Sequence, residues 1–418
     1  MTVCVIGAGV IGMATAYALA RRGFEVTVVD EGNEVGRGTS YANGAQLSYS
    51  YVAPLADASV WKALPGYLLC PDSPLTWRPT LDWQQWIWIA RFLRACNARA
   101  AENTTKELLK LAFFSKSCLE ELQGALRLDF SHRTAGKLVM LSEKKDMEKA
   151  KRQVALQASL GCEQEVLPID RCIDIEPTLA RPGKRWAGGV YTASEQVGDC
   201  AKFCHELAGV LKTRYGAQIR LATPVTGAWI GGNRINGLHT PQGAIEADAY
   251  VLANGVGAAS LGKSLGLRLP VYPLKGYSVT LEAAVNPADL PSVSITDLAR
   301  KVVYARVGNR LRVAGRAELV GNDLTVDRER CRQLAQEAAS LFHARADSDD
   351  DIAPWAGLRP ATPTGLPIIG ATPLSNLWTN VGHGALGWTL ACGSGELIAR
   401  QMNGEQGPID TTAFLYQH

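Results

Sequence analysis

The sequence predicts an α/β protein with two domains, one around an open parallel sheet and one α+β domain with an antiparallel sheet. Three observations predict it. Residues 1–30 read as strand, glycine-rich turn, helix and strand. Residues 245–255 form another apolar strand that ends in a small-residue turn, far along the chain. Residues 275–320 contain segments of alternating apolar and polar residues, typical of antiparallel strands. The parallel-sheet domain is therefore expected to be discontinuous in sequence.

The first thirty residues predict a Rossmann-like dinucleotide site. The turn after the first strand is Gly7-Ala8-Gly9-Val10-Ile11-Gly12. Gly7 and Gly9 let a pyrophosphate approach bare backbone at the N-terminus of the next helix, and Gly12 lets that helix pack closely on the sheet. Asp30 ends the second strand, where a carboxylate suits ribose hydroxyls and disfavours an NADP phosphate. The alternative is a glycine-rich turn that binds no ligand.

Composition excludes several other classes of protein. The chain has 418 residues, enough for two or three domains, and a net charge of +3 without a basic tract, which does not suggest nucleic acid. Its ten cysteines include no Cys-x-x-Cys pair, and Cys200, Cys204 and His205 lack a second ligand cluster, so no metal site is expected. Because the nucleotide fingerprint starts at residue 3, no standard export signal is expected, and the predicted location is cytoplasmic.

Residues 51–125 change character and predict an insertion rich in Trp and Pro. Five of the ten tryptophans lie here: Trp61, Trp77, Trp83, Trp86 and Trp88. Residues 81–93 have helical spacing of large apolar groups but are too short to span a bilayer. Two interpretations stay open. The helix is buried under the substrate domain, or it forms an amphipathic surface that docks on the inner face of the cytoplasmic membrane through Trp and Arg.

The remaining segments predict the domain boundaries. Residues 186–191 and 218–225 read as strands and residues 199–211 as a helix. The parallel-sheet domain is expected to comprise residues 1–50, 186–270 and 350–418. The substrate domain is expected to comprise residues 51–185 and 271–349.

The C-terminal segment carries a second glycine cluster. It contains Gly357-Leu358-Arg359-Pro360 and then Gly382-His383-Gly384-Ala385-Leu386-Gly387-Trp388-Thr389. A helix over residues 389–402 would point its N–H groups at an electron-rich atom above this turn. In a flavin enzyme that atom is at the N1/C2=O edge, which becomes negative on reduction. One nucleotide fingerprint near the N-terminus and one helix N-terminus near the C-terminus suit an extended FAD that is bound at both ends.

Several motifs, in order along nearly the whole chain, resemble the D-amino-acid dehydrogenase small subunit family. They are the Gly7 fingerprint, Gly38-Thr39-Ser40-Tyr41-Ala42-Asn43-Gly44, Pro273-Leu274-Lys275-Gly276-Tyr277-Ser278, Gly357 to Pro360, and Gly382 to Trp388. That family belongs to the wider D-amino-acid oxidase and glycine oxidase group of FAD-dependent oxidoreductases. The resemblance implies oxidation of a D-amino acid to an imine, which hydrolyses to a 2-oxo acid and ammonia.

Fingerprints and resemblance together predict the residues that bind a non-covalent FAD. They are Gly7, Gly9, Val10, Ile11, Gly12, Asp30, Glu31, Thr39, Ser40, Asn43, Gly44, Ala45, Val225, Ala253, Asn254, Gly255, Gly357, Arg359, Gly384, Ala385, Leu386, Gly387, Trp388 and Thr389. A covalent flavin, found in the related sarcosine oxidases, is not supported because residues 353–370 contain no cysteine. His383 is interpreted as part of the flavin site and not as a base.

The substrate's carboxylate needs an anchor that turns its Cα–H toward flavin N5, and a bidentate arginine is the natural one. The resemblance assigns this role to Arg359; the alternative is a structural ion pair. Arg306 and Arg316 are candidates for a second anchor. Tyr277 and Tyr304 are candidate hydroxyl donors or lids, although a half-buried strand tyrosine is the commoner case. Lys275 lies near the flavin or faces solvent. No strong general base is required, because the cofactor carries the reaction.

The substrate and the electron acceptor stay open at this stage. Tyr49 and Tyr51 predict a crowded pocket, which makes D-proline or hydroxy-D-proline an alternative to a plain D-amino acid. Electrons are expected to pass to a quinone or another membrane acceptor. A glycine- or sarcosine-type amine oxidase that uses O2 is a second alternative, and a flavin- or NAD-binding module without its own activity is a third.

Overall fold

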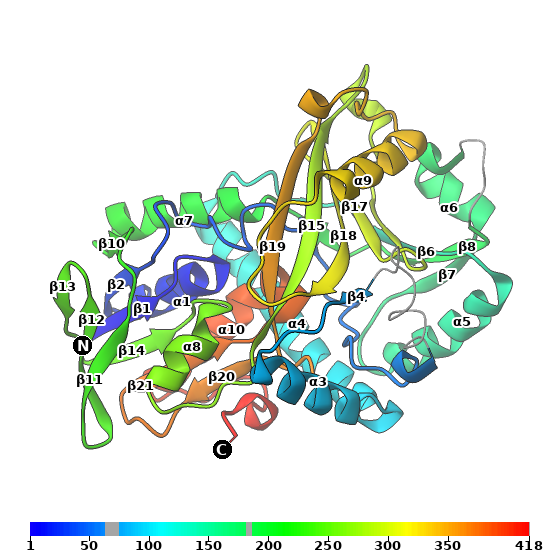
Figure 1. Cartoon of the computed structure of the whole chain (residues 1–418). Coiled ribbons are helices and arrows are strands. Elements are labelled where there is room, and N and C mark those ends of the chain that lie inside the picture. Colours follow the sequence, from blue (N-terminus) through cyan, green and yellow to red (C-terminus); the bar gives the residue numbers. More distant parts are fainter. Residues whose placement is uncertain (63–74, 181–185, 418) are drawn as a thin grey trace.

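The computed structural model describes residues 1–62, 75–180 and 186–417, and it contains two large sheets (Figure 1). The first has the strand order β10-β2-β1-β14-β21-β20, parallel except for β20. Its strands are β10 (Gln218–Arg220), β2 (Glu25–Val29), β1 (Thr2–Ile6), β14 (Ala249–Leu252), β21 (Leu377–Val381) and β20 (Ile368–Ala371). Segments from both ends and the middle of the chain build this sheet, which confirms that it is discontinuous in sequence.

Both faces of this sheet are covered, as a parallel sheet requires. In β1, Val3 and Val5 pack into one core cluster, whereas Cys4 and Ile6 pack into another on the opposite face. Helices on the first face are α1 (Val10–Ala20), α4 (Ala98–Leu126), α7 (Cys200–Tyr215) and α10 (Gly387–Met402). The second face carries α8 (Gly257–Ser264) and a small sheet of β11 (Gly227–Gly231), β12 (Arg234–Thr240) and β13 (Gly243–Ile245).

Small residues let α10 lie tightly between two helices. A Cβ atom at Gly395 would come within 2.8 Å of the Ala14 backbone in α1, and one at Gly393 within 2.8 Å of Ser115 in α4. Because backbone atoms cannot give way, only glycine fits at these positions. The N-terminus of α10 is thereby fixed relative to α1, close to the carboxyl ends of the parallel strands.

The second sheet contains nine described strands. Its order is β19-β15-β18-β17-β16-β6-β8-β7, and β4 pairs with β18. The strands are β19 (Ala353–Ala361), β15 (Tyr272–Glu282), β18 (Arg310–Leu319), β17 (Val302–Val307), β16 (Ser294–Asp297), β6 (Lys137–Leu141), β8 (Gly188–Thr192), β7 (Glu165–Pro168) and β4 (Leu75–Trp77). Helix α9 (Arg328–Leu341) packs against the apolar face of β15 and β18 (Figure 1). The antiparallel pairs β19-β15-β18-β17-β16 confirm the predicted second sheet.

Two strands join a different sheet from the one their predicted segment implies. β8 and β19 lie within residues 186–270 and 350–418, which we expected in the parallel-sheet domain, yet both pair within the second sheet. Residues 221–225 also do not extend β10, which ends at Arg220. The local pattern showed β8 as a strand but not its partner, because pairing depends on contacts between distant parts of the chain.

The Trp-rich insertion forms α3 (Trp83–Ala95), which Asp82 caps, followed by α4. One side of α3 is buried: Trp88 donates a hydrogen bond from its indole N–H to the Ala361 carbonyl oxygen at 2.9 Å. Trp83, Trp86 and Ile87 are exposed on the other side. The helix therefore has one buried side and one exposed apolar side, and docking on a membrane stays a prediction. Residues 63–74 of the insertion lie outside the described residues. Among the described helices, none combines the length and apolarity needed to cross a bilayer.

The remaining elements are another small sheet and two helices that pack on the second large sheet. They are a small sheet of β3 (Gln46–Leu47), β9 (Gln196–Val197) and β5 (Arg133–Thr134), and the helices α5 (Lys144–Ala158) and α6 (Ile169–Ile175). β3 is short but important for the site, because it carries the loop after residue 38 across to β9.

Candidate functional site

A cavity of about 1030 Å³ lies between the two large sheets. Ile6, Val29 and Ala253 line it from the ends of the parallel strands. Val303 and Ala314 line it from the second sheet. The carboxyl ends of parallel strands are where open α/β sheets bind ligands. The cavity is therefore the candidate site.

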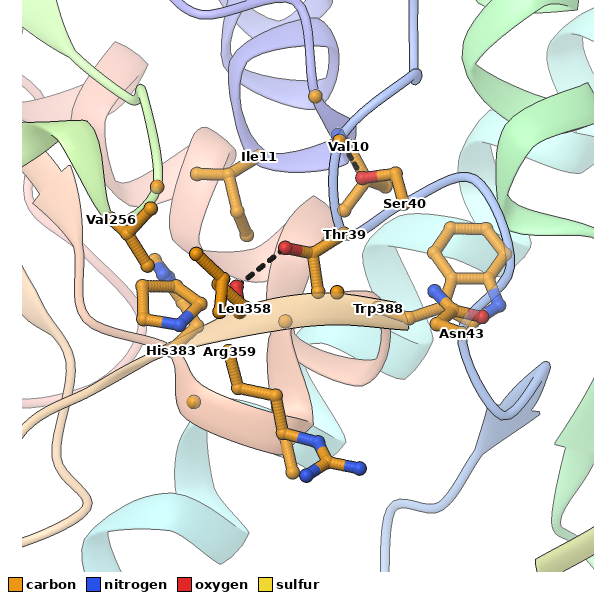
Figure 2. A pocket seen from close by; sticks show the side chains of 18 of the residues that line it. Val10, Ile11, Thr39, Ser40, Asn43, Val256, Leu358, Arg359, His383 and Trp388 are labelled. Carbon is orange, nitrogen blue, oxygen red and sulfur yellow. Dashed lines mark hydrogen bonds between the residues drawn. The ribbon is translucent and has the colours of Figure 1, made fainter. Parts of the chain in front are cut away.

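The glycine-rich turn after β1 lines the cavity, and a side chain at Gly7 or Gly12 would clash with nearby backbone. Gly7 has φ +116°, and a Cβ atom there would come within 2.5 Å of the Ala253 carbonyl oxygen. A Cβ atom at Gly12 would lie 1.8 Å from the Gly7 carbonyl oxygen. Val10 and Ile11 line the cavity at the first turn of α1, and the Val10 N–H donates to Ser40 Oγ at 3.0 Å (Figure 2). The start of α1 thus faces the cavity, as predicted.

Asp30 holds this turn in place. Its carboxylate accepts hydrogen bonds from the backbone N–H of Ala8 at 2.6 Å and of Gly32 at 2.7 Å. Asp30, Glu31 and Val225 all line the cavity beyond the end of β2. The carboxylate therefore has a structural task as well as a place in the cavity.

The loop that follows Gly38 is tied to the second sheet. Thr39 Oγ1 donates to the Leu358 carbonyl oxygen of β19 at 2.6 Å (Figure 2), and Arg312 of β18 donates to the Asn43 carbonyl oxygen at 3.0 Å. Ala45, with φ +57°, takes a left-handed conformation that the Asn43 side chain supports by accepting the Ala45 N–H at 3.0 Å. The loop is therefore a fixed wall of the cavity.

The C-terminal glycine cluster brings unpaired polar atoms to the cavity. His383 lies between Gly382 and Gly384, both with positive φ, and is 3% exposed. Burial lowers the pKa of His383 to about 3, so the imidazole is neutral. Within the described structure, His383 Nε2 and Asn254 Oδ1 are buried without a hydrogen-bond partner, and both residues line the cavity. Such atoms indicate that a polar ligand completes the site.

Helix α10 starts at Gly387, two residues earlier than predicted, and its first turn lines the cavity. The Trp388 ring points into the core, where it packs on Phe130 and Phe203 and donates its indole N–H to the Gly198 carbonyl oxygen at 3.2 Å. Thr389 Oγ1 accepts the N–H of Ser48 at 3.1 Å. The start of α10 therefore offers backbone N–H groups to a ligand, while the Trp388 side chain anchors the helix.

Arg359 reaches the cavity from β19 with no acidic partner among the described residues. Its guanidinium lies over Gly276, where a Cβ atom would come within 2.3 Å of Nη2, and Nη1 donates to the Arg316 carbonyl oxygen at 3.1 Å. Burial lowers its pKa to about 10. In Figure 2 the side chain points away from the Val10 turn. The ion-pair alternative finds no support in this geometry.

The other candidates for substrate contact face the opposite side of the second sheet. Lys275 and Tyr304 are absent from the described lining of the cavity. Lys275 is buried and pairs with Asp323 at 3.0 Å, while the Tyr304 hydroxyl donates to Glu337 at 3.3 Å. Tyr277 reaches the cavity, but its ring lies in the core beside α9 and its hydroxyl donates to Glu318 at 3.0 Å.

The alternation of side chains along a strand explains this outcome. On β15, Leu274, Gly276 and Ser278 line the cavity, so the side chains of Lys275 and Tyr277 between them point to α9. On β17, Val303 lines the cavity and Tyr304 does not. The sequence showed chemically suitable residues without showing the face of the sheet they occupy.

The two candidates for a second anchor are also directed elsewhere. Arg306 Nε donates to the Gly308 carbonyl oxygen at 3.1 Å. Arg316 lines the cavity, but its side chain donates to Gln333 of α9 at 3.0 Å. Of the two tyrosines thought to crowd the pocket, Tyr51 lines the cavity, whereas the Tyr49 hydroxyl donates to Gln196 at 3.1 Å, and Tyr49 is not among the described lining residues.

Sequence reasoning missed Lys137. This side chain from β6 is 3% exposed, lines the cavity, and donates to Gln46 Oε1 at 2.9 Å and to Ser48 Oγ at 2.7 Å. Burial lowers the pKa of Lys137 to about 8. A lysine at the head of the apolar run Leu138 to Leu141 is the signal that was available. In the described parts of the chain, no three His, Cys, Asp or Glu side chains gather as a metal site would require.

Comparison with known proteins matches this architecture. Residues 2–401 match the DAO family model, described as FAD dependent oxidoreductase. A D-amino acid dehydrogenase 2 of Ralstonia nicotianae is 46% identical over 406 residues, 96% of each chain. A D-amino acid dehydrogenase 2 of Pseudomonas aeruginosa is 44% identical over 99% of this chain and 97% of its own.

Solved structures share the fold. Glycine oxidase from Geobacillus kaustophilus has a TM-score of 0.76 and 23% identity, covering 100% of this chain and 98% of its own. L-proline dehydrogenase from P. horikoshii has a TM-score of 0.74 and 18% identity, covering 97% and 94%. The predicted cofactor, FAD, is confirmed by the family match. The chain belongs to the DAO family of FAD-dependent oxidoreductases.

Proposed function

We propose that this protein is an FAD-dependent dehydrogenase that oxidises a D-amino acid to its imine, which water then hydrolyses to a 2-oxo acid and ammonia. The observation that carries the proposal is Arg359, a buried guanidinium in the cavity with no acidic partner among the described residues. Relatives 46% and 44% identical over nearly their whole length are named D-amino acid dehydrogenase. Their names support the substrate class.

The residues at both ends of the cavity fit FAD. The start of α1 can hold the pyrophosphate, since Gly9 has no side chain to block its approach and the helix dipole favours negative charge. Asp30 and Glu31 lie where the ribose would follow. The unpaired atoms of Asn254 and His383 and the start of α10 are left for the flavin ring. The remaining predicted cofactor contacts line the same cavity except Gly12, which packs beneath the turn.

Arg359 positions the substrate in this proposal. A guanidinium presents two parallel N–H donors to a carboxylate, which fixes the orientation of Cα as well as its place. A bound carboxylate would also supply the counter-charge that the buried guanidinium lacks in the described structure. A bound flavin would supply the hydride acceptor for the Cα–H bond, and the chain's own task would be to hold that bond against the ring and exclude water.

We further propose a quinone-type acceptor at a membrane surface. Exposed Trp83, Trp86 and Ile87 on α3 support this location, and the exposed Arg91 and Arg94 on the same helix suit anionic headgroups. The competing acceptor is O2, as expected of a glycine- or sarcosine-type amine oxidase. Tyr51 on the cavity wall favours a compact substrate, so D-proline or hydroxy-D-proline is the second candidate within the D-amino acids.

Anaerobic mixing of the purified flavoprotein with D- and L-amino acids, including both prolines, glycine and sarcosine, tests these proposals. We expect D-isomers alone to bleach the flavin band, with slow recovery in air and fast recovery after a quinone analogue is added. Bleaching by L-isomers would overturn the substrate class. Rapid recovery in air would identify an oxidase.

A further inference from the structure

Lys137 is a buried cation that the proposed chemistry does not yet use. Its ammonium is 3% exposed, and both of its hydrogen bonds go to neutral oxygens, Gln46 Oε1 at 2.9 Å and Ser48 Oγ at 2.7 Å. The described residues provide no carboxylate within ion-pair distance. Burying a charge in this way is costly unless an anion is nearby when the protein functions.

The position of Lys137 in the sheet argues against a shared role with Arg359. Lys137 starts β6, and Arg359 lies on β19 with β15, β18, β17 and β16 between them. Five strand spacings amount to about 24 Å measured along the sheet. The amino and carboxylate groups of an α-amino acid are attached to one carbon. We therefore expect Arg359, and not Lys137, to hold the substrate's carboxylate.

Hydrogen bonds connect Lys137 instead to the start of α10. Lys137 Nζ donates to Ser48 Oγ, and the backbone N–H of Ser48 donates to Thr389 Oγ1 in the first turn of the helix at 3.1 Å. Gln46 is fixed beside it, because its amide donates to the Ile295 carbonyl oxygen at 3.2 Å. Ser48 thus links the ammonium by hydrogen bonds to the first turn of α10, the helix end that would face the flavin N1–C2=O edge.

We propose that Lys137 stabilises the negative charge that bound FAD acquires at its N1–C2=O edge on reduction, and that it raises the flavin reduction potential together with the α10 N-terminus. This inference rests on the flavin placement of the proposed function but not on the identity of the substrate. Lys137 acts electrostatically through Ser48 and Gln46, so it is a positioning residue. A buried cation and a helix dipole close to one edge reinforce each other.

Two titratable groups face Lys137. The carboxylate of Glu195 is buried and accepts the backbone N–H groups of Tyr49 and Ser50, each at 2.7 Å, and its charge partly offsets that of the lysine. Tyr51 places its ring 4.7 Å from Nζ, and burial raises its pKa to about 12, so it stays neutral. Because burial lowers the pKa of Lys137 to about 8, the cation is present at neutral pH and is lost as the pH rises above that value.

The test compares holoenzyme variants by flavin reduction potential and by sulfite affinity. Sulfite adds to flavin N5 and leaves a negative charge at N1–C2=O, so its binding reports on that edge without any substrate. We expect Lys137→Met to bind sulfite about tenfold more weakly and to lower the potential by about 30 mV, the equivalent of tenfold for a two-electron couple. Lys137→Arg, which keeps the cation, should restore both values. Lys275→Met is the matched control, since it removes a buried lysine from the opposite face of the sheet.

Unchanged potential and sulfite affinity in Lys137→Met would overturn the inference, and a changed KM for amino acids alone would assign Lys137 to substrate binding instead. If Lys137→Met does not retain FAD, Lys137→Gln provides a second variant that removes the cation but keeps a hydrogen-bonding side chain. It should show the same loss of sulfite affinity and of potential, because the charge is gone. Wild-type values in Lys137→Gln would also contradict the inference. A protein that fails to oxidise D-amino acids would leave these measurements valid, so the two proposals fail separately.

Discussion

The guanidinium of Arg359 occupies the space that any side chain at residue 276 would need. A Cβ atom built on Gly276 would lie 2.3 Å from Nη2 and 2.6 Å from Nη1 of Arg359. The two residues are neighbours on adjacent strands, since Gly276 pairs with Gly357 and Arg359 pairs with Leu274. The glycine in the Lys275-Gly276-Tyr277 segment is therefore explained by the arginine on β19, which the sequence did not indicate.

Removing the arginine tests its proposed role directly. We expect Arg359→Ala to lower kcat/KM at least 100-fold, mostly through KM, because about 3 kcal/mol of charge-assisted hydrogen bonding to the substrate's carboxylate is lost. Arg359→Lys should recover little of this loss, since an ammonium cannot reproduce two parallel donors. Steady-state kinetics and the flavin spectrum provide the measurement. An unchanged KM with an intact spectrum would remove Arg359 from the carboxylate site.

Gly276→Ala should separate function from stability. The atoms that a new methyl group meets belong to the end of a flexible side chain, so the arginine can move aside and the fold should lose little stability. The displaced guanidinium would no longer hold the carboxylate in place, and we expect KM to rise about tenfold, with a small change in Tm. Gly209→Ala is the control, because nothing lies within 4 Å of that site. Wild-type KM in Gly276→Ala would show that the guanidinium position is not critical.

Gly7→Ala should act on FAD binding and folding together. Its methyl group would meet the backbone of Ala253 and Asn254, which cannot move aside, and φ +116° is strained for alanine. We expect the purified variant to hold less than about a tenth of the wild-type flavin and to unfold at lower temperature. The flavin-to-protein absorbance ratio and a thermal melt measure both effects. Gly124→Ala in α4, with open space around it and outside the cavity lining, should keep its flavin. Full flavin content in Gly7→Ala would contradict the expected clash with the backbone of Ala253 and Asn254.

The parts of the fold and of the candidate site that could be predicted from the sequence are those that local chemistry determines. Glycines at fixed spacing and an acid at the end of β2 indicated the α1 turn, and the Gly382 to Thr389 segment indicated the α10 end. The face of a strand and its partner strand were not predictable in the same way. Tyr304 and Lys275 were selected for their chemistry, yet the pleat turns both away from the cavity, and Lys137 was missed because one lysine before an apolar run usually indicates an exposed strand end.

Glu396 couples α10 to α1 and should make stability depend on pH. Its carboxylate accepts hydrogen bonds from Arg22 at 2.7 Å, Arg21 at 3.0 Å and Arg400 at 2.8 Å. Burial alone would raise its pKa, but the hydrogen bonds and charges of these arginines outweigh burial and lower it. A carboxyl group with a lowered pKa stabilises the folded state above its unfolded value of about 4.3. That contribution is lost as the pH falls through the folded pKa.

Glu396→Gln should therefore cost about 3 kcal/mol at pH 7, because three guanidinium groups lose a buried partner. The difference from wild type should begin to shrink as the pH falls below the unfolded value of about 4.3, and it should continue to shrink as the pH falls through the lower folded pKa of the carboxyl group. Urea unfolding at pH 7 and at a series of lower values measures this. The exposed carboxylate of Glu148, which pairs with Lys151, supplies the control, and Glu148→Gln should change little at any pH. If Glu396→Gln lowers the free energy of unfolding by the same amount at every pH, packing and not charge holds α10 against α1.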